Sequence, residues 1–423
     1  MESLMNIKKQ KYTFFILLSI ALILSLAFYG CQIIPPVPEE AKWTVMVYLA
    51  AGNDLETVGI QDINEMEMVG STKDVNIVVQ MDRIPFSALN KLGLGIYDDD
   101  SNNNWTGTRR YYITQDMNPN IINSTLKMDL GEKNMGDPET LKDFAQWSIQ
   151  NYPAQRYMLV LWNHGGGFRS SEIISRDICW DYNFGLDRIT MPQLEDALFF
   201  IYGQLGKEID IIGMDACYMG MIEVAYQVKD YAQIMVASEA SVPGDGWQYD
   251  AVMESFVANP NQNANQFASE IVDCYYHQYS GTGGNVTLSA VDLSQIDNLA
   301  GQISGLAQAV INDYSVPKDN YRDARDSSQY YTGIGFEYID LKHFVNRLPS
   351  YTANYSVLNY ADQINQSMEL GNVIIENTQI GNSVNNSYGL TIYWPYYIYS
   401  DYYDNTNFAQ DKLWDEMLYH LGY

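Results

Sequence analysis

Residues 157–167 read YMLVLWNHGGG, and residues 209–217 read IDIIGMDAC. In each stretch a short, β-rich apolar run ends in a polar or glycine-rich segment, which predicts a buried strand of a parallel sheet. Groups that follow the carboxyl ends of such strands face the crevice where α/β proteins bind ligands. We therefore expect His164 and Cys217 to meet at one edge of a sheet, although they lie far apart in the chain.

Strands and helices alternate around these two stretches. Strands are expected at 43–50, 75–82, 157–163, 209–214, 234–238 and 286–291, a hairpin at 93–97 with 109–114, and helices at 55–68, 139–150, 191–205 and 220–228. Such alternation predicts an α/β fold, a mostly parallel sheet with helices on both faces. The core would span 42–291 and contain a long loop at 166–188. The region 292–423 is largely helical, and we expect its late strand at 388–394 to return to the sheet.

The N-terminus has the pattern of an export signal. Three lysines precede an uncharged, largely apolar stretch at 14–28, and Gly30-Cys31 follows. A basic start, an apolar middle and a small residue before the cut predict a signal peptide at 1–31. Gly30-Cys31 resembles the bacterial lipobox, in which the cysteine (here Cys31) carries lipid, and an uncleaved anchor is the alternative. Both place the body outside the cytoplasm, joined through a proline-rich tether at 32–41.

Charge and cysteine usage exclude several classes of protein. The formal net charge of −28 makes nucleic acid and anionic membrane surfaces poor partners. The four cysteines are too few for a disulfide framework, and no cysteine–histidine cluster has the spacing of a metal site. The acidic stretch 98–104 lacks the ordered ligand spacing of a calcium loop, so we interpret it as a solvated turn. No metal site is predicted.

A cysteine and a histidine at one sheet edge have the chemistry for nucleophilic catalysis. A cysteine attacks as thiolate, and an imidazole takes its proton and later protonates the leaving amine. The backbone N–H groups of Gly165 and Cys217 would form an oxyanion hole, and the helix expected at 220–228 would favour the thiolate. A lone cysteine is more often a small core residue, and we interpret Cys274, in a helix-like stretch, as buried. Cys179 is the rival nucleophile, but no strand ends before it and no helix starts after it.

The motifs around the pair resemble a known family. A cysteine after Xaa-Ala, with a histidine about 50 residues upstream, is the caspase-type signature. His164-Gly165, Asp215-Ala216-Cys217, Ser238-Glu239 and the PGDGW stretch at 243–247 together resemble the clostripain family of cysteine peptidases. The likeness covers 43–423, from an opening WTVMVY to a late GLTIYWP, and implies a caspase-like fold.

The resemblance implies a function and its residues. Cys217 would be the nucleophile and His164 the general base of a peptidase that cleaves after Arg or Lys, without an organic cofactor. Asp215 and Asp245 match the positions that would bind the basic side chain. The bland alternatives are a helix cap for Asp215 and a turn residue for Asp245.

The family also suggests how the protein would be matured and where it would act. Self-cleavage after Arg176 would activate a precursor, and a calcium requirement is left open. Partners would be proteins or peptides with basic residues, and the membrane through the N-terminal lipid or anchor. A catalytically silent surface-binding lipoprotein of the same fold and a transpeptidase are the competing functions.

Overall fold

The computed structural model describes residues 40–85, 99–166, 177–331, 337–396 and 399–423, and residues 41–423 form one compact unit. Several sequence-based predictions lie outside the described residues: the signal peptide with Cys31, nearly all of the tether, the strand at 93–97, and Arg176. Among the described residues no helix has the length and apolar character needed to cross a bilayer.

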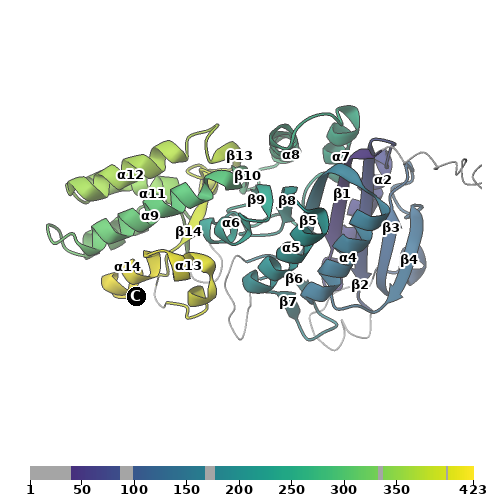
Figure 1. Ribbon diagram of the computed structural model, residues 1–423, viewed down its shortest axis with the longest axis horizontal. Coiled ribbons are helices and arrows are strands. Elements are labelled where there is room, and N and C mark those ends of the chain that lie inside the picture. Colours follow the sequence, from purple (N-terminus) through teal and green to yellow (C-terminus); the bar gives the residue numbers. More distant parts are fainter. Residues whose placement is uncertain (1–39, 86–98, 167–176, 332–336, 397–398) are drawn as a thin grey trace, which may run out of the picture. The chain divides into compact units, whose positions relative to one another are not determined.

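A nine-stranded sheet in the order β13-β10-β9-β8-β5-β1-β2-β3-β4 forms the centre of this unit (Figure 1). Its central strands are parallel: β1 (Ala41–Leu49), β2 (Val75–Arg83), β5 (Ala154–Trp162), β8 (Ile209–Asp215) and β9 (Ala232–Ala237). Antiparallel strands extend both sides: β3 (Gly107–Tyr112), β4 (Thr125–Gly131), β10 (Val286–Asp292) and β13 (Ile374–Ile380). The α/β prediction is confirmed.

Helices cover both faces of the sheet, which is why the central strands are apolar on both sides. Along β1, Met46 and Tyr48 join one core cluster while Val45 and Val47 join the other. The first face is covered by α4 (Pro138–Asn151), α5 (Met191–Leu205) and α6 (Ile222–Val228), and α9 (Ile296–Ile311) packs against α6 in the same core cluster. The second is covered by α2 (Glu56–Val69), α7 (Tyr249–Ala258) and α8 (Ala264–Tyr279).

The C-terminal region is largely helical, as expected, but its strands differ from the prediction. Its helices are α9, α10 (Asp319–Asp326), α11 (Leu341–Arg347), α12 (Tyr355–Ser367), α13 (Asn407–Asp411) and α14 (Trp414–Leu421). The strand expected at 388–394 is β14 (Thr391–Tyr393), which joins β11 (Tyr330–Tyr331) and β12 (Tyr338–Asp340) in a small sheet. β13 joins the large sheet instead. As a half-exposed edge strand it carries polar residues that conceal it in the sequence.

Two further expectations were wrong in detail. The stretch 166–188, predicted to be a loop, contains a hairpin of β6 (Ile178–Asp181) and β7 (Asp187–Ile189). The strands are too short for a periodic signal, and Gly185 and Leu186 make the turn with positive φ. The strand predicted at 109–114 is β3. Its two edges pair with β2 and β4, so the predicted hairpin had the wrong partner for this strand.

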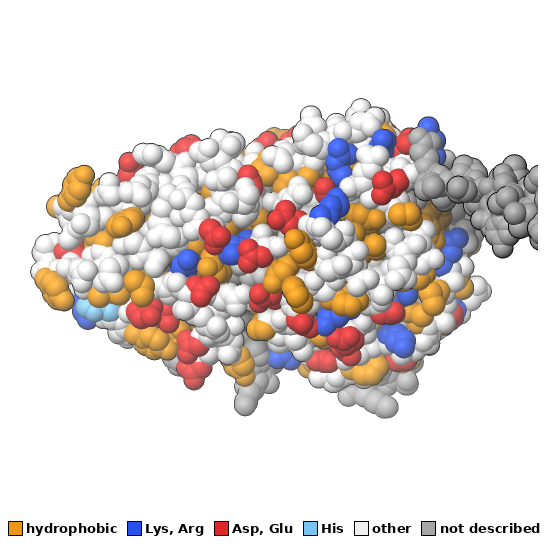
Figure 2. Space-filling model, viewed as in Figure 1, with side chains coloured by type: hydrophobic (Ala, Val, Ile, Leu, Met, Phe, Trp, Pro, Cys, Tyr) orange, Lys and Arg blue, Asp and Glu red, His pale blue; other side chains and the backbone are white. Residues whose placement is uncertain are grey.

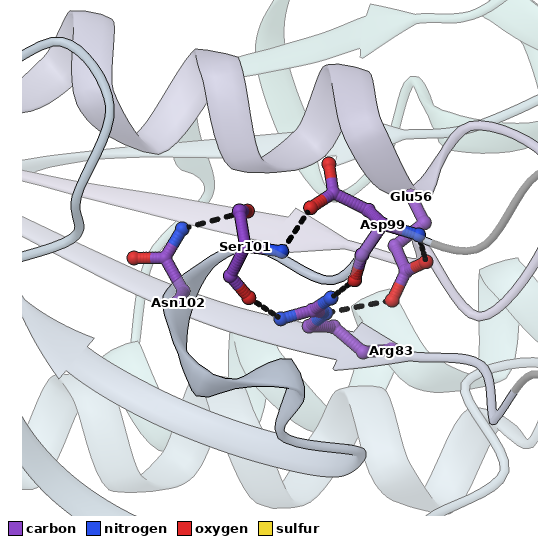
Figure 3. A network of polar contacts seen from close by, with 5 residues as sticks. All are labelled: Glu56, Arg83, Asp99, Ser101 and Asn102. Atoms are coloured by element: carbon purple, nitrogen blue, oxygen red, sulfur yellow. Dashed lines mark hydrogen bonds and ion pairs between the residues drawn. The ribbon is translucent and has the colours of Figure 1, made fainter.

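The acidic turn is held by a buried cation rather than by solvent alone (Figure 3). The guanidinium of Arg83, at the end of β2, pairs with Glu56 at 2.6 Å and donates to the backbone carbonyls of Asp99 and Ser101. Asn102–Asn104 follow with positive φ, a backbone region that asparagine tolerates. Elsewhere on the face in Figure 2 acidic side chains are spread among basic and hydrophobic ones, which fits a solvated acidic surface.

Candidate active site

Neighbouring parallel strands bring the two predicted loops together. Trp162 at the end of β5 is in register with Asp215 at the end of β8, and the Asn163 N–H donates to the Asp215 carbonyl at 3.3 Å. A Cβ on Gly165 would lie 2.5 Å from the Cys217 carbonyl oxygen, so only glycine fits this approach. The loop that carries His164 therefore packs directly on the loop that carries Cys217.

Cys217 is half-buried, and backbone amides surround its sulfur. The Val242 N–H donates to Sγ at 3.3 Å. Burial raises the pKa of the Cys217 thiol, and the Asp215 charge adds to this. The N–H groups of Val242, Gly165 and Cys217 itself oppose the rise. The last two are the predicted oxyanion donors, so both lie beside the thiol.

The expectation that a helix N-terminus favours the Cys217 thiolate was wrong. The helix predicted at 220–228 begins only at Ile222, after the N-cap Met221, so Cys217 lies outside its first turn. The effect of a helix N-terminus falls off within one turn, and α6 is short. Individual N–H groups, rather than a helix, are the positive partners of this sulfur.

His164 has a carboxylate partner that the sequence did not reveal. Its Nε2 lies 2.8 Å from Oδ1 of Asp54, and its ring stacks on Tyr182 with centroids 6.5 Å apart. Desolvation raises the pKa of Asp54, but the hydrogen bond and charge of His164 outweigh it and leave that pKa lowered. A proton on Nε2 satisfies the carboxylate and leaves Nδ1 as the ring's proton acceptor.

Asp54 lies just before α2, at a place in the sequence where Asn or Asp commonly caps a helix. The N-cap residue of α2 is Leu55, and no side chain caps this helix. Asn53 instead donates to the carbonyls of Ala50 and Trp180. Asp54 is thereby turned outward to His164, a contact between distant segments that sequence spacing does not encode.

A pocket of about 180 Å³ opens beside Cys217 and His164. We call it the acidic pocket; it is lined by Leu55, Trp162, Asn163, His164, Asp215, Cys217, Val242, Pro243, Gly244 and Gly246. Oδ2 of the buried Asp215 accepts hydrogen bonds from the Trp247 N–H at 3.0 Å and the Tyr249 hydroxyl at 3.1 Å. Its Oδ1 is buried and has no hydrogen-bond partner among the described residues. Asp215 therefore does not cap α6.

Burial raises the pKa of Asp215 to about 7, although both hydrogen bonds to its carboxylate lower it. A Cβ on Gly246 would lie 2.7 Å from Oδ2, so glycine with positive φ is required where the loop wraps this carboxyl. A second carboxyl lies behind the first. Asp62 on α2 is buried, and desolvation followed by the Asp215 charge raises its pKa.

Asp245 occupies a different environment from Asp215. It is exposed between Gly244 and Gly246, which line the acidic pocket, and is itself absent from the lining. Its charge nevertheless contributes to the raised pKa values of Asp62 and Glu65. Asp245 thus adds negative potential at this edge of the sheet without contacting the pocket interior.

The other motif residues and cysteines have structural roles. Ser238 bonds to Thr287 on β10, and Glu239 accepts from the Gly389 N–H, so the Ser238-Glu239 motif ties β9 to its neighbours. Cys179 is fully buried in β6, and burial raises its thiol pKa strongly. Cys274 in α8 is half-buried rather than buried as expected, and desolvation raises its pKa to about 11.

A metal site is not apparent in the described part of the chain. No group of three or more His, Cys, Asp or Glu side chains there is arranged to hold an ion. Asp98, the first residue of the acidic turn, lies outside the described residues.

Comparison with known proteins gives consistent matches. The model of the clostripain family matches residues 47–420. Clostripain from Hathewaya histolytica is 32% identical over 246 residues, 53% of this chain and 44% of that relative, so the chain spans less than half its length.

Solved structures give the same fold. A secreted cysteine protease from Bacteroides thetaiotaomicron, solved with an irreversible peptide inhibitor, has a TM-score of 0.64 and 21% identity and covers 90% of this chain and 99% of that one. An inactive zymogen protease from Parabacteroides distasonis has a TM-score of 0.64 and 20% identity, with 89% and 99% covered. Both have the fold seen here. Because the family model spans nearly the whole body, this chain belongs to the clostripain family.

Proposed function

We propose that this chain is an exported cysteine endopeptidase that cleaves peptide bonds after Arg or Lys. The observation that carries the proposal is the buried Oδ1 of Asp215, which has no hydrogen-bond partner among the described residues and belongs to a side chain lining a pocket beside Cys217. A buried carboxylate without a counter-ion is costly, and a bound guanidinium or ammonium offsets that cost. Asp245, exposed at the mouth, would add attraction at longer range.

The reaction would proceed through a thioester. His164 takes the Cys217 proton, and the sulfur attacks the carbonyl carbon of the basic residue. The N–H groups of Gly165 and Cys217 hold the resulting oxyanion. The C–N bond breaks as His164 protonates the leaving amine, and water, deprotonated by His164, then hydrolyses the thioester. Asp54 orients the ring and stabilises its charged form.

Substrate binding would also activate the nucleophile. The Asp215 charge raises the pKa of Cys217, and pairing with a substrate cation cancels that charge. The thiol would therefore ionise most readily when the correct side chain occupies the acidic pocket. Iodoacetamide should alkylate Cys217 faster in the Asp215→Asn variant than in wild type at pH 8. Peptide mapping at Cys217 measures the two rates. An equal or slower rate would contradict this coupling.

The same proposal includes export, lipid attachment at Cys31 and self-cleavage after Arg176. The partners of the chain would be protein or peptide substrates. The described chain resumes at Asp177, whose buried carboxylate pairs with Arg188 at 2.9 Å. A cut after Arg176 would leave this anchor in place. Incubation of wild type and Arg176→Ala tests it: both should show the same starting band, and only wild type should be cut there.

The decisive experiment is a cleavage profile on a peptide library with Cys217→Ala as control. Cleavage after Arg or Lys that the control lacks supports the proposal. Equal cleavage by the control would refute the mechanism, whereas Cys217-dependent cleavage after other residues would refute only the pocket assignment. No cleavage and no adduct with an arginine acyloxymethyl ketone would favour a catalytically silent binding protein.

A further inference from the structure

A larger hollow, of about 670 Å³, lies directly next to the acidic pocket. Consecutive residues line the two cavities: Ser241 lines the larger hollow, and Val242 lines the acidic pocket. Tyr218, which follows Cys217, also lines the larger hollow. Consecutive Cα atoms are about 3.8 Å apart, so a chain that reaches Cys217 arrives within a few residues at this hollow.

Sheet topology places both hollows along one edge. β10 is antiparallel to β9, so Asn285, just before β10, lies at the edge where β9 ends. β13 is antiparallel to β10 with Val286 opposite Ile380, so the residues after β13 return to the same edge. An extended polypeptide crossing the ends of β5, β8 and β9 therefore meets this hollow next.

The chemistry of the larger hollow is neutral and rich in hydrogen-bonding groups, in contrast to the acidic pocket. No Lys, Arg, Asp or Glu is among its described lining residues. Amide side chains at 382, 385 and 386, hydroxyls at 241, 327 and 328, and the rings of Tyr218 and Tyr330 supply most of the surface. We call it the amide pocket.

The walls of the amide pocket are preorganised. Nδ1 of His343 accepts the Gln329 N–H at 2.7 Å, which fixes the ring's proton on Nε2. The Gln329 side chain donates to the Ser383 carbonyl at 2.7 Å, and Asn285 accepts the Ser383 N–H at 3.1 Å. These bonds clamp together three segments that are distant in sequence. The exposed side chain of Asn382, by contrast, makes no hydrogen bond within the described chain and is available to a ligand.

We infer that the amide pocket is a second specificity site, which binds an uncharged polar or aromatic side chain of the polypeptide whose basic residue occupies the acidic pocket. This inference rests on the proposed function and adds a substrate class to it. A charged side chain would lose hydration there without gaining a counter-ion, whereas amides, hydroxyls and rings find partners. Selection would then require a basic residue and a neutral polar residue at a fixed separation.

A charge-reversal pair tests the inference. Asn382→Lys and Asn382→Glu alter an exposed side chain without removing an internal hydrogen bond. kcat/KM is measured on internally quenched peptides in which each position flanking the basic residue is varied in turn, on both sides of the scissile bond. An N-acylated arginine coumarin amide serves as minimal substrate, and Asn312→Lys, exposed at the end of α9, controls for net charge.

At one substrate position, Asn382→Lys should favour Glu over Lys by about tenfold relative to wild type, and Asn382→Glu should show the reverse. That position identifies the residue that enters the amide pocket, and wild type should prefer an uncharged side chain there. The Asn312→Lys control should keep wild-type preferences, and the rate on the minimal substrate normalises each variant's rates on the longer peptides. Unchanged preferences at every position would overturn the inference. Failure of wild type to cleave any basic substrate would instead overturn the proposed function.

Discussion

Arg83 and Asp215 are both buried charges at the carboxyl ends of parallel strands, yet their surroundings differ. Each nitrogen of the Arg83 guanidinium donates to Glu56, Asp99 or Ser101 (Figure 3). Oδ1 of Asp215 has no hydrogen-bond partner in the part of the chain that the structure describes, and burial raises the pKa of this carboxyl to about 7. A buried charge with an internal counter-ion stabilises a turn, whereas one without a counter-ion is suited to a ligand of opposite charge.

Substitution of Arg83 should have the largest effect, because it removes the internal counter-ion of a buried carboxylate. Arg83→Met leaves Glu56 buried without its counter-ion, and we expect a loss of about 3–5 kcal/mol in the free energy of unfolding. Urea denaturation of the purified protein measures it. The double variant Arg83→Met/Glu56→Gln should recover a large part of the loss. A loss of equal size in both variants would show that packing, rather than the charge pair, stabilises this turn.

Asp215→Asn tests the opposite case. It keeps the hydrogen bonds from Trp247 and Tyr249 but removes the charge from the acidic pocket. We expect kcat/KM for arginine substrates to fall ~30- to 1,000-fold, which corresponds to a loss of about 2–4 kcal/mol in transition-state stabilisation. Asp245→Asn is the matched control at an exposed position and should lose much less. Equal losses in the two variants would place the substrate cation outside the pocket.

The Asp215→Asn variant should also become more stable relative to wild type as pH rises. Burial favours the protonated form of Asp215, so its contribution to stability is present below the unfolded pKa of 3.8 and is lost as pH rises through about 7. That shift corresponds to about 4 kcal/mol over the full interval, of which an uncharged amide recovers a part.

Denaturation at pH 5 and pH 8 checks this expectation. The stability of Asp215→Asn relative to wild type should increase between the two values. A constant difference would mean that the native carboxyl ionises with an ordinary pKa.

Asp54 gives the smallest expected effect, because its pair with His164 is about one-third exposed. Asp54→Asn should lower kcat by about tenfold with little change in KM, since exposed ion pairs are worth about 1 kcal/mol or less and the loss reflects ring orientation. A change in KM alone would argue against a positioning role.

Much of the fold followed from local patterns. Continuous apolar runs such as YMLVLWN mark strands that are buried on both faces, and the helix over 191–205 was predicted to the residue. Prediction failed where that signal is weak. β13 is half-exposed, and β6 and β7 are very short, so propensity cannot distinguish them from loops. β14 was recognised as a strand, but its pairing outside the large sheet depends on tertiary contacts.

The sequence alone predicted that His164 and Cys217 follow strand ends at one edge of a sheet and that Asp215 precedes Cys217 there, because strand periodicity and glycine placement are local properties. Only the tertiary structure decided that Asp54 contacts His164, that one oxygen of Asp215 has no hydrogen-bond partner among the described residues, and that a neutral pocket adjoins an acidic one. Each of these depends on which distant groups burial brings within hydrogen-bonding distance, and no spacing along the chain encodes that.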